Sequence, residues 1–500
     1  MDGKIHKWAF MAKSIKENYI FSLINTISGI LFPLITFPYA SRIMEADGMG
    51  QIGFFTSIIT YVSLFTSLGI PIYAIREIAK VRDDAEQMSL TTIEILLLHT
   101  LLVIIGYIAI AVMCMTVSKI AVDIPLFLIL SASVFFTAIG CEWFYQGIEE
   151  FKYIALRGLF VRIIYVILLF SLVHTKEDIL IYAGLTILGT VGNNVFNFCR
   201  LWRYVKIKFV TYKKIRISRH IVPAFKIFAL NLVVSLYVNL DTVMLGFLKN
   251  NYAVGYYDGA SKIARLILAL IQALQTAMIP RFSYLAKEGD LTKFHQLAQK
   301  VFDYIVTISL PITIALGVLS PSLIHLFCGP SYEPAIITLE IMSPIVFMIS
   351  LSGIAGLQIL YPLGKESLVI WSTITGAIVN LIMCFLLIPS YSANGAAIAV
   401  LMGETSVTVS MFIYGRRYIK IERMSRHYLN CIIGTLLLFV LILLIRLAGL
   451  NDWINIFLIP LVGIIVYSII LYIMRDEFFS YLFTLICAKV VKFRGLRHQN

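Results

Sequence analysis

The chain has 500 residues, of which 59% are hydrophobic and only 14% charged, with a mean hydropathy of +0.88. A soluble protein of this length needs far more polar surface, so the surplus apolar surface must face lipid. The net charge of +13 would suit a nucleic-acid-binding protein, but the basic residues lie mainly in the loops between apolar segments, which argues against that class.

Apolar segments alternate with short loops along the whole chain. A helix needs about 20 apolar residues to cross the hydrocarbon core, and about fourteen segments qualify. We place them near 18–40, 52–75, 90–117, 124–146, 158–174, 178–199, 227–248, 253–280, 301–328, 335–361, 367–388, 393–415, 428–445 and 453–474. The pattern predicts an all-α polytopic membrane protein. Nearly every second loop is basic, which predicts that both termini are cytoplasmic.

A polar stretch divides the predicted helices into six and eight. Gly53-Phe54-Phe55 after the first helix is matched by Gly255-Tyr256-Tyr257 after the seventh, a weak repeat that is typical of two-lobed transporters. We expect an N-terminal lobe at 1–202, a basic amphipathic cytoplasmic linker at 203–226, a C-terminal lobe at 227–418, an extra helix pair at 419–475 and a basic cytoplasmic tail at 476–500.

Motifs for enzymatic chemistry are missing from the sequence. The seven cysteines are scattered without paired or CxxC spacing, and they are typical of apolar packing residues. HExxH, Walker A and GxSxG motifs do not occur. We therefore expect no catalytic residue, no cofactor and no metal site.

Polar residues form stripes at helical spacing in the first, second, seventh and eighth predicted helices. Candidate sugar-binding residues in these stripes are Asn25, Asn231, Asn239 and Gln272. Residues three, four or seven apart share one face of a helix. Small polar residues also serve helix packing in membranes, which is the alternative interpretation. The position of the stripes in the first two helices of each expected lobe favours a shared aqueous cavity.

Charges inside the apolar segments are the strongest functional candidates. Lys262 and Arg265 lie about two turns into the eighth predicted helix, where a charge costs roughly 2.5–3.5 kcal/mol. Asp258 can pair with Lys262 at i,i+4, and this pair does not neutralise Arg265. This face is predicted to bind an anion.

Arg42 ends the first helix on the outer side, either as a ligand or as a snorkelling residue. Arg162 is interpreted as an anchor near the cytoplasmic end of the fifth helix.

Acidic residues also fall within the predicted helices, namely Glu94, Asp241, Asp303, Glu340 and Glu404. Each could take up a proton or pair with a cation. Asp241 and Glu404 are the better candidates for a coupling-ion site.

Several stretches resemble the Wzx-type polysaccharide flippases of the MOP exporter superfamily. They are 31–39 (LFPLITFPY) with Ser41-Arg42, 48–53 (GMGQIG), 142–147 (EWFYQG) with Arg157, and 394–399 (NGAAIA). The likeness extends over the whole chain. One departure is Met44-Glu45-Ala46-Asp47, where such proteins often have Leu-Gly, so the turn there is expected to be altered.

The resemblance implies a two-lobed flippase of the bacterial cytoplasmic membrane. It would carry undecaprenyl-diphosphate-linked oligosaccharide repeat units to the outer leaflet by alternating access, for O-antigen, capsule or exopolysaccharide synthesis. A polysaccharide polymerase and a chain-length regulator are the implied partners, beside membrane lipids. Arg42, Lys262 and Arg265 are the candidates for the diphosphate. The alternatives are a cation-coupled multidrug exporter of the same superfamily, which would need an acidic cavity, and a membrane polymerase or ligase, which usually carries a large outer loop.

Overall fold

The computed structural model describes residues 15–209, 215–421, 426–447, 449, 451–480 and 484, and within these residues every regular element is a helix. Part of the predicted linker and most of the predicted C-terminal tail lie outside them. Ten helices of the described part are long and apolar enough to cross a membrane, or eleven if the bent pair Lys176–Val191 and Asn193–Leu201 counts as one span. The all-α membrane class is confirmed, whereas the number fourteen stays a prediction.

The chain divides into two compact units. Unit 1 runs up to Met44 and continues over Gln51–Leu236, and unit 2 comprises Glu45–Gly50 and the chain from Tyr237 onward. The boundary falls inside one long helix, past the segment 203–226 where the sequence placed the linker, because the first turns of that helix pack into the core of unit 1.

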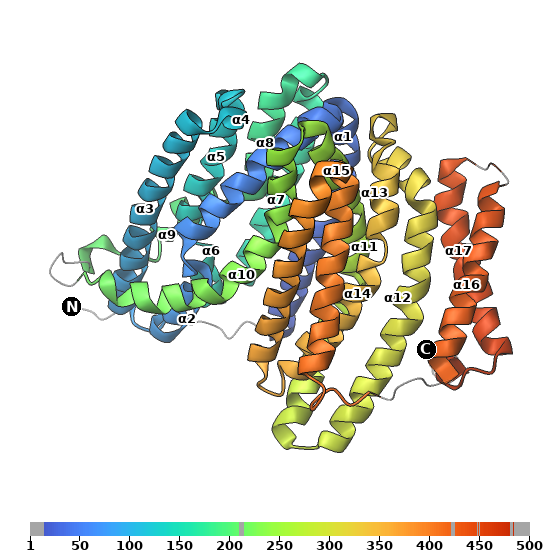
Figure 1. Cartoon of the computed structure of the whole chain (residues 1–500). Coiled ribbons are helices and arrows are strands. Elements are labelled where there is room, and N and C mark those ends of the chain that lie inside the picture. Colours follow the sequence, from blue (N-terminus) through green and yellow to red (C-terminus); the bar gives the residue numbers. More distant parts are fainter. Residues whose placement is uncertain are drawn as a thin grey trace, which may run out of the picture. The chain divides into compact units, whose positions relative to one another are not determined.

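Unit 1 is a bundle in which α2 packs on α3 and α6, and α5 packs on α3 and α8 (Figure 1). Its helices are α1 (Ile15–Ser67), α2 (Ile70–Val81), α3 (Ala85–Thr116), α4 (Ser118–Ala121), α5 (Ile124–Ile139), α6 (Glu142–Gly147), α7 (Phe151–Leu172), α8 (Ile179–Val191), α9 (Asn193–Leu201) and the start of α10 (Ser218–Leu248), with 3-10 turns at Lys176–Asp178 and Ile207–Phe209.

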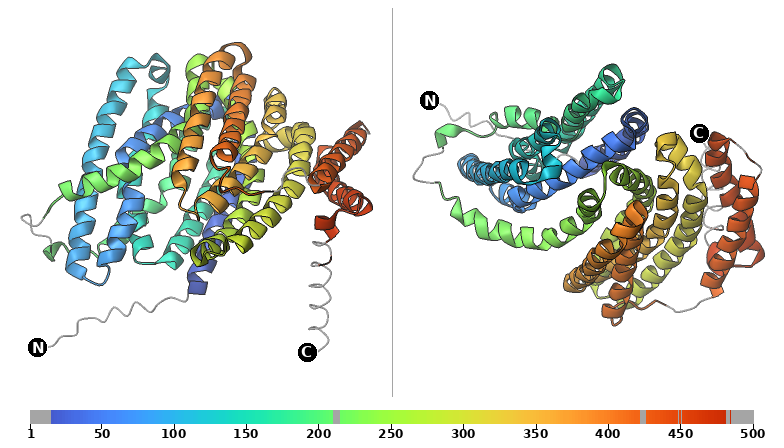
Figure 2. Two further views of the ribbon diagram at one scale, coloured as in Figure 1. Left: turned by 60° about the horizontal axis from the view of Figure 1, so that its bottom comes forward. Right: turned by 45° about the horizontal axis from the view of Figure 1, so that its top comes forward.

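Unit 2 contains the rest of α10 and seven further helices. They are α11 (Asn251–Glu288), α12 (Leu291–Phe327), α13 (Ala335–Met342), α14 (Ile345–Gly353), α15 (Glu366–Tyr414), α16 (Arg426–Leu447) and α17 (Asp452–Ile473), with a 3-10 turn at Pro330–Tyr332 and a π-helix at Ile354–Leu360. The last pair, α16 and α17, packs against α12 (Figure 2).

Two helices are much longer than one membrane crossing needs, and each contains a sharp break. In α1 the break is at Glu45, with φ 53° and ψ −175°, and in α15 it is at Ser392, with φ 54° and ψ −129°. Both conformations strongly favour glycine, so a side chain there strains the backbone. The turn that departs from the Leu-Gly of similar proteins is therefore the strained one.

The glycines that follow the break in α1 allow two backbones to touch within unit 2. A Cβ at Gly50 would lie 1.8 Å from the carbonyl oxygen of Asn251, and one at Gly255 would lie 2.0 Å from that of Ala46. Only glycine fits at such distances. Gly50 in the motif 48–53 and Gly255 in the partial repeat at 255–257 thus allow a close contact between the two helices.

Several helices extend beyond the apolar segments from which they were predicted. α7 begins at Phe151 rather than near residue 158, and α11 continues to Glu288 rather than ending near 280. Side-chain caps mark other helix starts, as where the Asn250 side chain accepts from the backbone N–H of Ala253 at 3.0 Å. Hydropathy finds the part of a helix that lies in hydrocarbon, whereas polar turns continue it outside.

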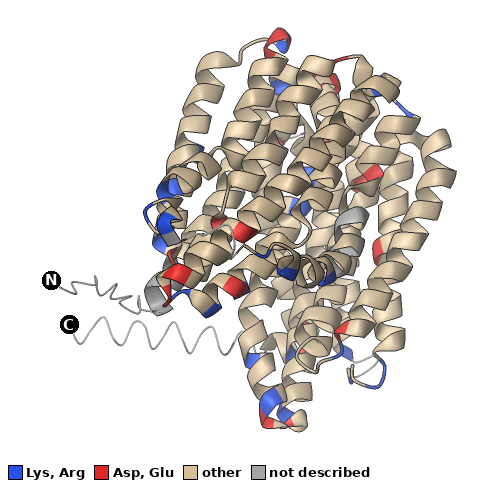
Figure 3. Ribbon diagram, turned by 90° about the vertical axis from the view of Figure 1, so that its left-hand side faces the viewer, with Lys and Arg blue, Asp and Glu red and all other residues tan. Residues whose placement is uncertain are grey.

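Figure 3 shows Lys, Arg, Asp and Glu gathered mostly toward helix ends and loops.

The start of α10 and the residues just before it are held to the rest of unit 1 by one buried acid of α3. The Glu94 carboxylate has no exposed surface and pairs with Arg219 at 2.5 Å and with His220 Nε2 at 2.8 Å. It also accepts the backbone N–H of Arg216 at 2.6 Å. Tyr73 of α2 contacts the other ring nitrogen of His220 at 2.7 Å. Glu94 therefore pairs with the Arg219 cation in a structural contact.

Candidate functional site

Asp241 lies at the centre of a buried hydrogen-bond cluster in unit 2. Its side chain is 1% exposed. The Tyr257 hydroxyl donates to Oδ2 at 2.9 Å and the Asn380 amide donates to Oδ1 at 2.9 Å. The Cys384 thiol donates to the same Oδ1 at 3.2 Å. Donors from α11 and α15 thus surround a carboxylate of α10 and satisfy it away from water.

Glu404 of α15, the second predicted coupling residue, is connected to this cluster by Arg265. The Arg265 side chain is exposed on α11, and its Nε donates to Ser261 Oγ at 3.1 Å. Its guanidinium interacts electrostatically with both Asp241 and Glu404. The structure therefore brings together three residues that the sequence singled out separately.

Lys262 is exposed one turn after Asp258, as the i,i+4 pairing predicted. The Asp258 carboxylate interacts electrostatically with Lys262 and with Arg265, and it accepts from Thr242 Oγ1 at 3.4 Å. Two cations and one acid thus share this part of α11. The exposed charges on the face remain net basic.

The other predicted binding residues are spread over both units. Gln272 is exposed seven residues after Arg265, on the same face of α11, and Asn239 is half-buried on α10. Arg42 is exposed on α1 in unit 1. Asn231 belongs to α10, but its side chain lies outside the described residues.

Asn25 of α1 contacts an arginine that the sequence interpretation had set aside. Arg162 Nη1 donates to the backbone carbonyl of Asn25 and to its Oδ1, each at 3.2 Å, and to the hydroxyl of Ser28. Arg162 is half-buried at the midpoint of α7, which begins seven residues before the predicted apolar segment. Its interpretation as an anchor near the cytoplasmic end stays a prediction.

The motif at 142–147 has a structural explanation in the same unit. Arg157 of α7 pairs with the Glu142 carboxylate at 3.1 Å and donates to the side chain of Asn197. The Tyr145 hydroxyl donates to the backbone carbonyl of Asn197 at 2.7 Å. Trp143 and Tyr145 belong to the buried core of unit 1. These residues join α6, α7 and α9 and show no feature of a ligand site.

Sequence reasoning missed four residues that belong to these clusters. Tyr257 and Asn380 were not considered, and Cys384 was interpreted as a packing residue. Asn380 and Cys384 are four residues apart on one face of α15, a spacing that could have drawn attention. Arg162 could have been found by extending its helix back to Phe151.

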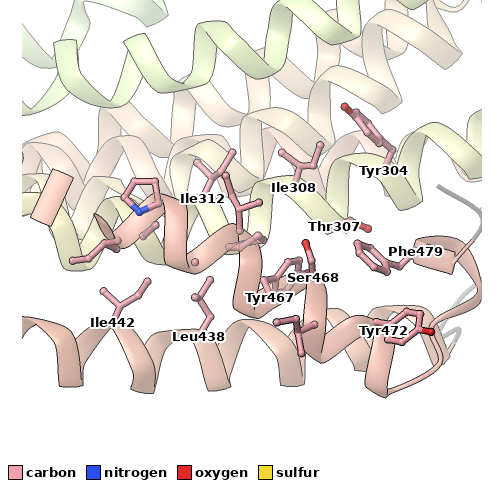
Figure 4. A pocket seen from close by; sticks show the side chains of 17 residues that line it. Tyr304, Thr307, Ile308, Ile312, Leu438, Ile442, Tyr467, Ser468, Tyr472 and Phe479 are labelled. Atoms are coloured by element: carbon pink, nitrogen blue, oxygen red, sulfur yellow. The ribbon is translucent and has the colours of Figure 1, made fainter. Parts of the chain in front are cut away.

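A cavity of about 880 Å³ lies between α12, α16 and α17 in unit 2 (Figure 4). Its lining is almost entirely apolar, as with Ile308, Ile312, Leu438 and Ile442. None of the predicted site residues lines it. An apolar surface of this kind accommodates hydrocarbon and offers no partner to a charged headgroup.

Comparison with known proteins identifies the family. A family described as "Polysaccharide biosynthesis protein" matches residues 15–286. The chain is 26% identical to the "Putative O-antigen transporter" of Escherichia coli strain K12 over 406 residues, which cover 81% of this chain and 97% of that protein. It is 22% identical over 232 residues to the "Probable low-salt glycan biosynthesis flippase Agl15" of Haloferax volcanii, covering 46% of this chain and 49% of that one.

A solved structure of the "Lipid II flippase MurJ" in an inward closed conformation has the same fold. It matches with a TM-score of 0.70 at 15% identity, over 92% of this chain and 99% of that one. The family match, the related transporter sequences and the shared fold agree. The chain therefore belongs to the polysaccharide biosynthesis protein family.

Proposed function

We propose that this protein is a flippase that carries undecaprenyl-diphosphate-linked oligosaccharide repeat units from the inner to the outer leaflet of the bacterial cytoplasmic membrane. The observation that supports this most is the exposed basic face of α11, with Lys262 and Arg265 inside a membrane-spanning helix. The related proteins are named an O-antigen transporter and a glycan biosynthesis flippase. The diphosphate would bind to Lys262 and Arg265, while Arg42 adds a further positive charge in unit 1.

Transport would proceed by alternating access of two lobes, with both termini in the cytoplasm. The sugars would hydrogen-bond to Asn25, Asn231, Asn239 and Gln272 in place of water, and the polyprenyl chain would stay in lipid. Outward movement of one negative charge down a negative-inside potential yields about 2.3 kcal/mol per 100 mV. A diphosphate with roughly two charges would yield about twice that. A polysaccharide polymerase and a chain-length regulator would receive the product.

Asp241 and Glu404 would bind the coupling cation, either H⁺ or Na⁺. Both interact with Arg265, so a change of charge on either acid alters the field at the proposed diphosphate site. Coupling would thus act through electrostatics within unit 2. Imposed pH and Na⁺ gradients on proteoliposomes distinguish the two ions, and Asp241→Asn is expected to remove the response to the gradient that drives transport.

The double variant Lys262→Gln/Arg265→Gln tests the assignment of substrate. Surface polysaccharide should disappear while the amount of protein in the membrane stays normal. The matched control is Arg281→Gln/Lys287→Gln, which removes two exposed cations from the last turns of the same helix. Export that persists in the first variant would contradict the proposed function.

The multidrug alternative is less well supported, because such an exporter needs accessible acids for cationic drugs. Here the acid at the centre of the cluster is buried and the exposed residues beside it are basic.

A further inference from the structure

Arg162 lies at the middle of α7, one of the helices that are long and apolar enough to cross a membrane. α7 has 22 residues and is therefore about 33 Å long, close to the roughly 30 Å of the hydrocarbon core. Arg162 lies eleven residues after Phe151 and ten before Leu172. A charge at the centre of a spanning helix costs roughly 2.5–3.5 kcal/mol unless it meets water or a partner. A residue kept there despite this cost calls for a function.

The protein supplies Arg162 with neutral acceptors only. Its hydrogen bonds within the described chain go to Asn25 and Ser28, and no carboxylate of that part lies within ion-pair distance. Glu142, with which it interacts electrostatically, is already paired with Arg157. Among the described residues, the positive charge of Arg162 thus has no anion that is not already paired.

The unused donors of Arg162 form one edge of the guanidinium. All three hydrogen bonds come from Nη1, whereas Nε and Nη2 contact no acceptor in the described part of the chain. The Arg162 side chain is only half-buried, so part of it stays accessible. The Nε and Nη2 edge is the fork that binds two oxygens of a phosphate group at once.

Two glycines shape the space around this edge. A Cβ at Gly29, an exposed position, would make van der Waals contact with Nη2 at 3.8 Å, so a longer side chain there could cover this nitrogen. A Cβ at Gly158 would lie 3.3 Å from Asn25 Oδ1, so this glycine lets α1 approach α7 closely enough to hold Nη1. Asn25 and Ser28 therefore act as positioning residues for the guanidinium.

We propose that Arg162 is a second phosphate-binding residue of this protein, located in unit 1, which takes a phosphate oxyanion of a lipid headgroup on its Nε and Nη2 edge. This inference rests on the proposed flippase function and adds a residue that the basic face of α11 does not include. The phosphate could belong to a polyprenyl diphosphate or to an anionic phospholipid. Both present the same oxygens to the guanidinium.

Binding to the purified full-length protein in detergent tests the proposal, with farnesyl diphosphate and a short-chain phosphatidylglycerol as separate probes. Arg162→Gln removes the fork, and Arg162→Lys keeps the charge without the bidentate geometry. Gly29→Leu fills the space before Nη2 and leaves the arginine in place. The matched control is Gly184→Leu on α8, at an exposed glycine where a Cβ meets nothing within 4 Å.

Arg162→Gln and Gly29→Leu are each expected to weaken binding of one probe about tenfold or more, with a smaller loss for Arg162→Lys and none for Gly184→Leu. Loss confined to farnesyl diphosphate identifies the transported lipid as the source of the phosphate. Loss of phosphatidylglycerol binding identifies a bilayer phospholipid as the source of the phosphate.

Unchanged binding of both probes in Arg162→Gln and Gly29→Leu overturns the inference while the proposed function stands. The proposed function fails separately, if the wild-type protein binds no farnesyl diphosphate and export survives the loss of Lys262 and Arg265.

Discussion

Two arginines, one in each unit, differ in the acids that surround them. In unit 2, Arg265 has Asp241, Asp258 and Glu404 as electrostatic neighbours, and Asp241 is further satisfied by three hydrogen-bond donors. In unit 1, the one acidic electrostatic neighbour of Arg162 among the described residues is Glu142, which is paired with Arg157, and its hydrogen bonds there go to neutral acceptors. A compensated cluster can change its charge with little change in structure, which suits ion coupling. An uncompensated cation attracts an anion from outside, which suits ligand binding.

The same contrast occurs within one helix. Arg157 and Arg162 lie five residues apart on α7, yet Arg157 is buried with Glu142 and Asn197, whereas Arg162 is half-exposed with free donors. Arg157 therefore stabilises unit 1. Position in the sequence does not distinguish two arginines that differ so much in their surroundings.

Asp241→Ala should produce the largest effect on stability. It leaves the Tyr257 hydroxyl and the Asn380 amide buried without their acceptor and should lower the free energy of unfolding by about 2–5 kcal/mol. Thermal unfolding in detergent measures this, with Glu288→Ala, an exposed acid near the end of α11, as the control. A loss no greater than that of the control would show that the cluster in unit 2 is not compensated as described.

Arg162→Met should have the opposite sign. Because removal of an uncompensated charge relieves its cost in the membrane, stability should stay equal or rise by at most about 3 kcal/mol. Arg157→Met on the same helix should instead destabilise the protein, since it leaves Glu142 and Asn197 without their partner. Melting temperatures of the two variants, measured side by side, give the comparison directly. Equal losses would remove the distinction between the two arginines.

Glu45→Gly should give the smallest effect and provides a scale for the others, since it changes backbone strain without touching either charged cluster. Relief of the positive φ should raise stability by about 1–2 kcal/mol. Asp47→Gly, two residues later where φ is not positive, should not stabilise. If both variants behave alike, strain at residue 45 is not the cause.

Some of the site could be predicted because charge inside an apolar segment is visible in one dimension. Lys262, Arg265, Asp241 and Glu404 stood out for this reason, and three of them do come together. Their hydrogen-bond partners could not be predicted, since Asn380 and Cys384 lie 139 and 143 residues from Asp241. Neutral residues carry no signal of a polar contact until the fold brings them close.

The sequence by itself determined the membrane environment and the helical class, because the bilayer permits long apolar helices and few other structures. The tertiary structure alone decided which charges are compensated. Asp241 acquired its donors from α11 and α15, Arg157 its acid from α6, and Arg162, among the described residues, hydrogen bonds to neutral oxygens of α1. The energy of a buried charge depends on what surrounds it within a few ångströms, and that is set by packing between helices far apart in the chain.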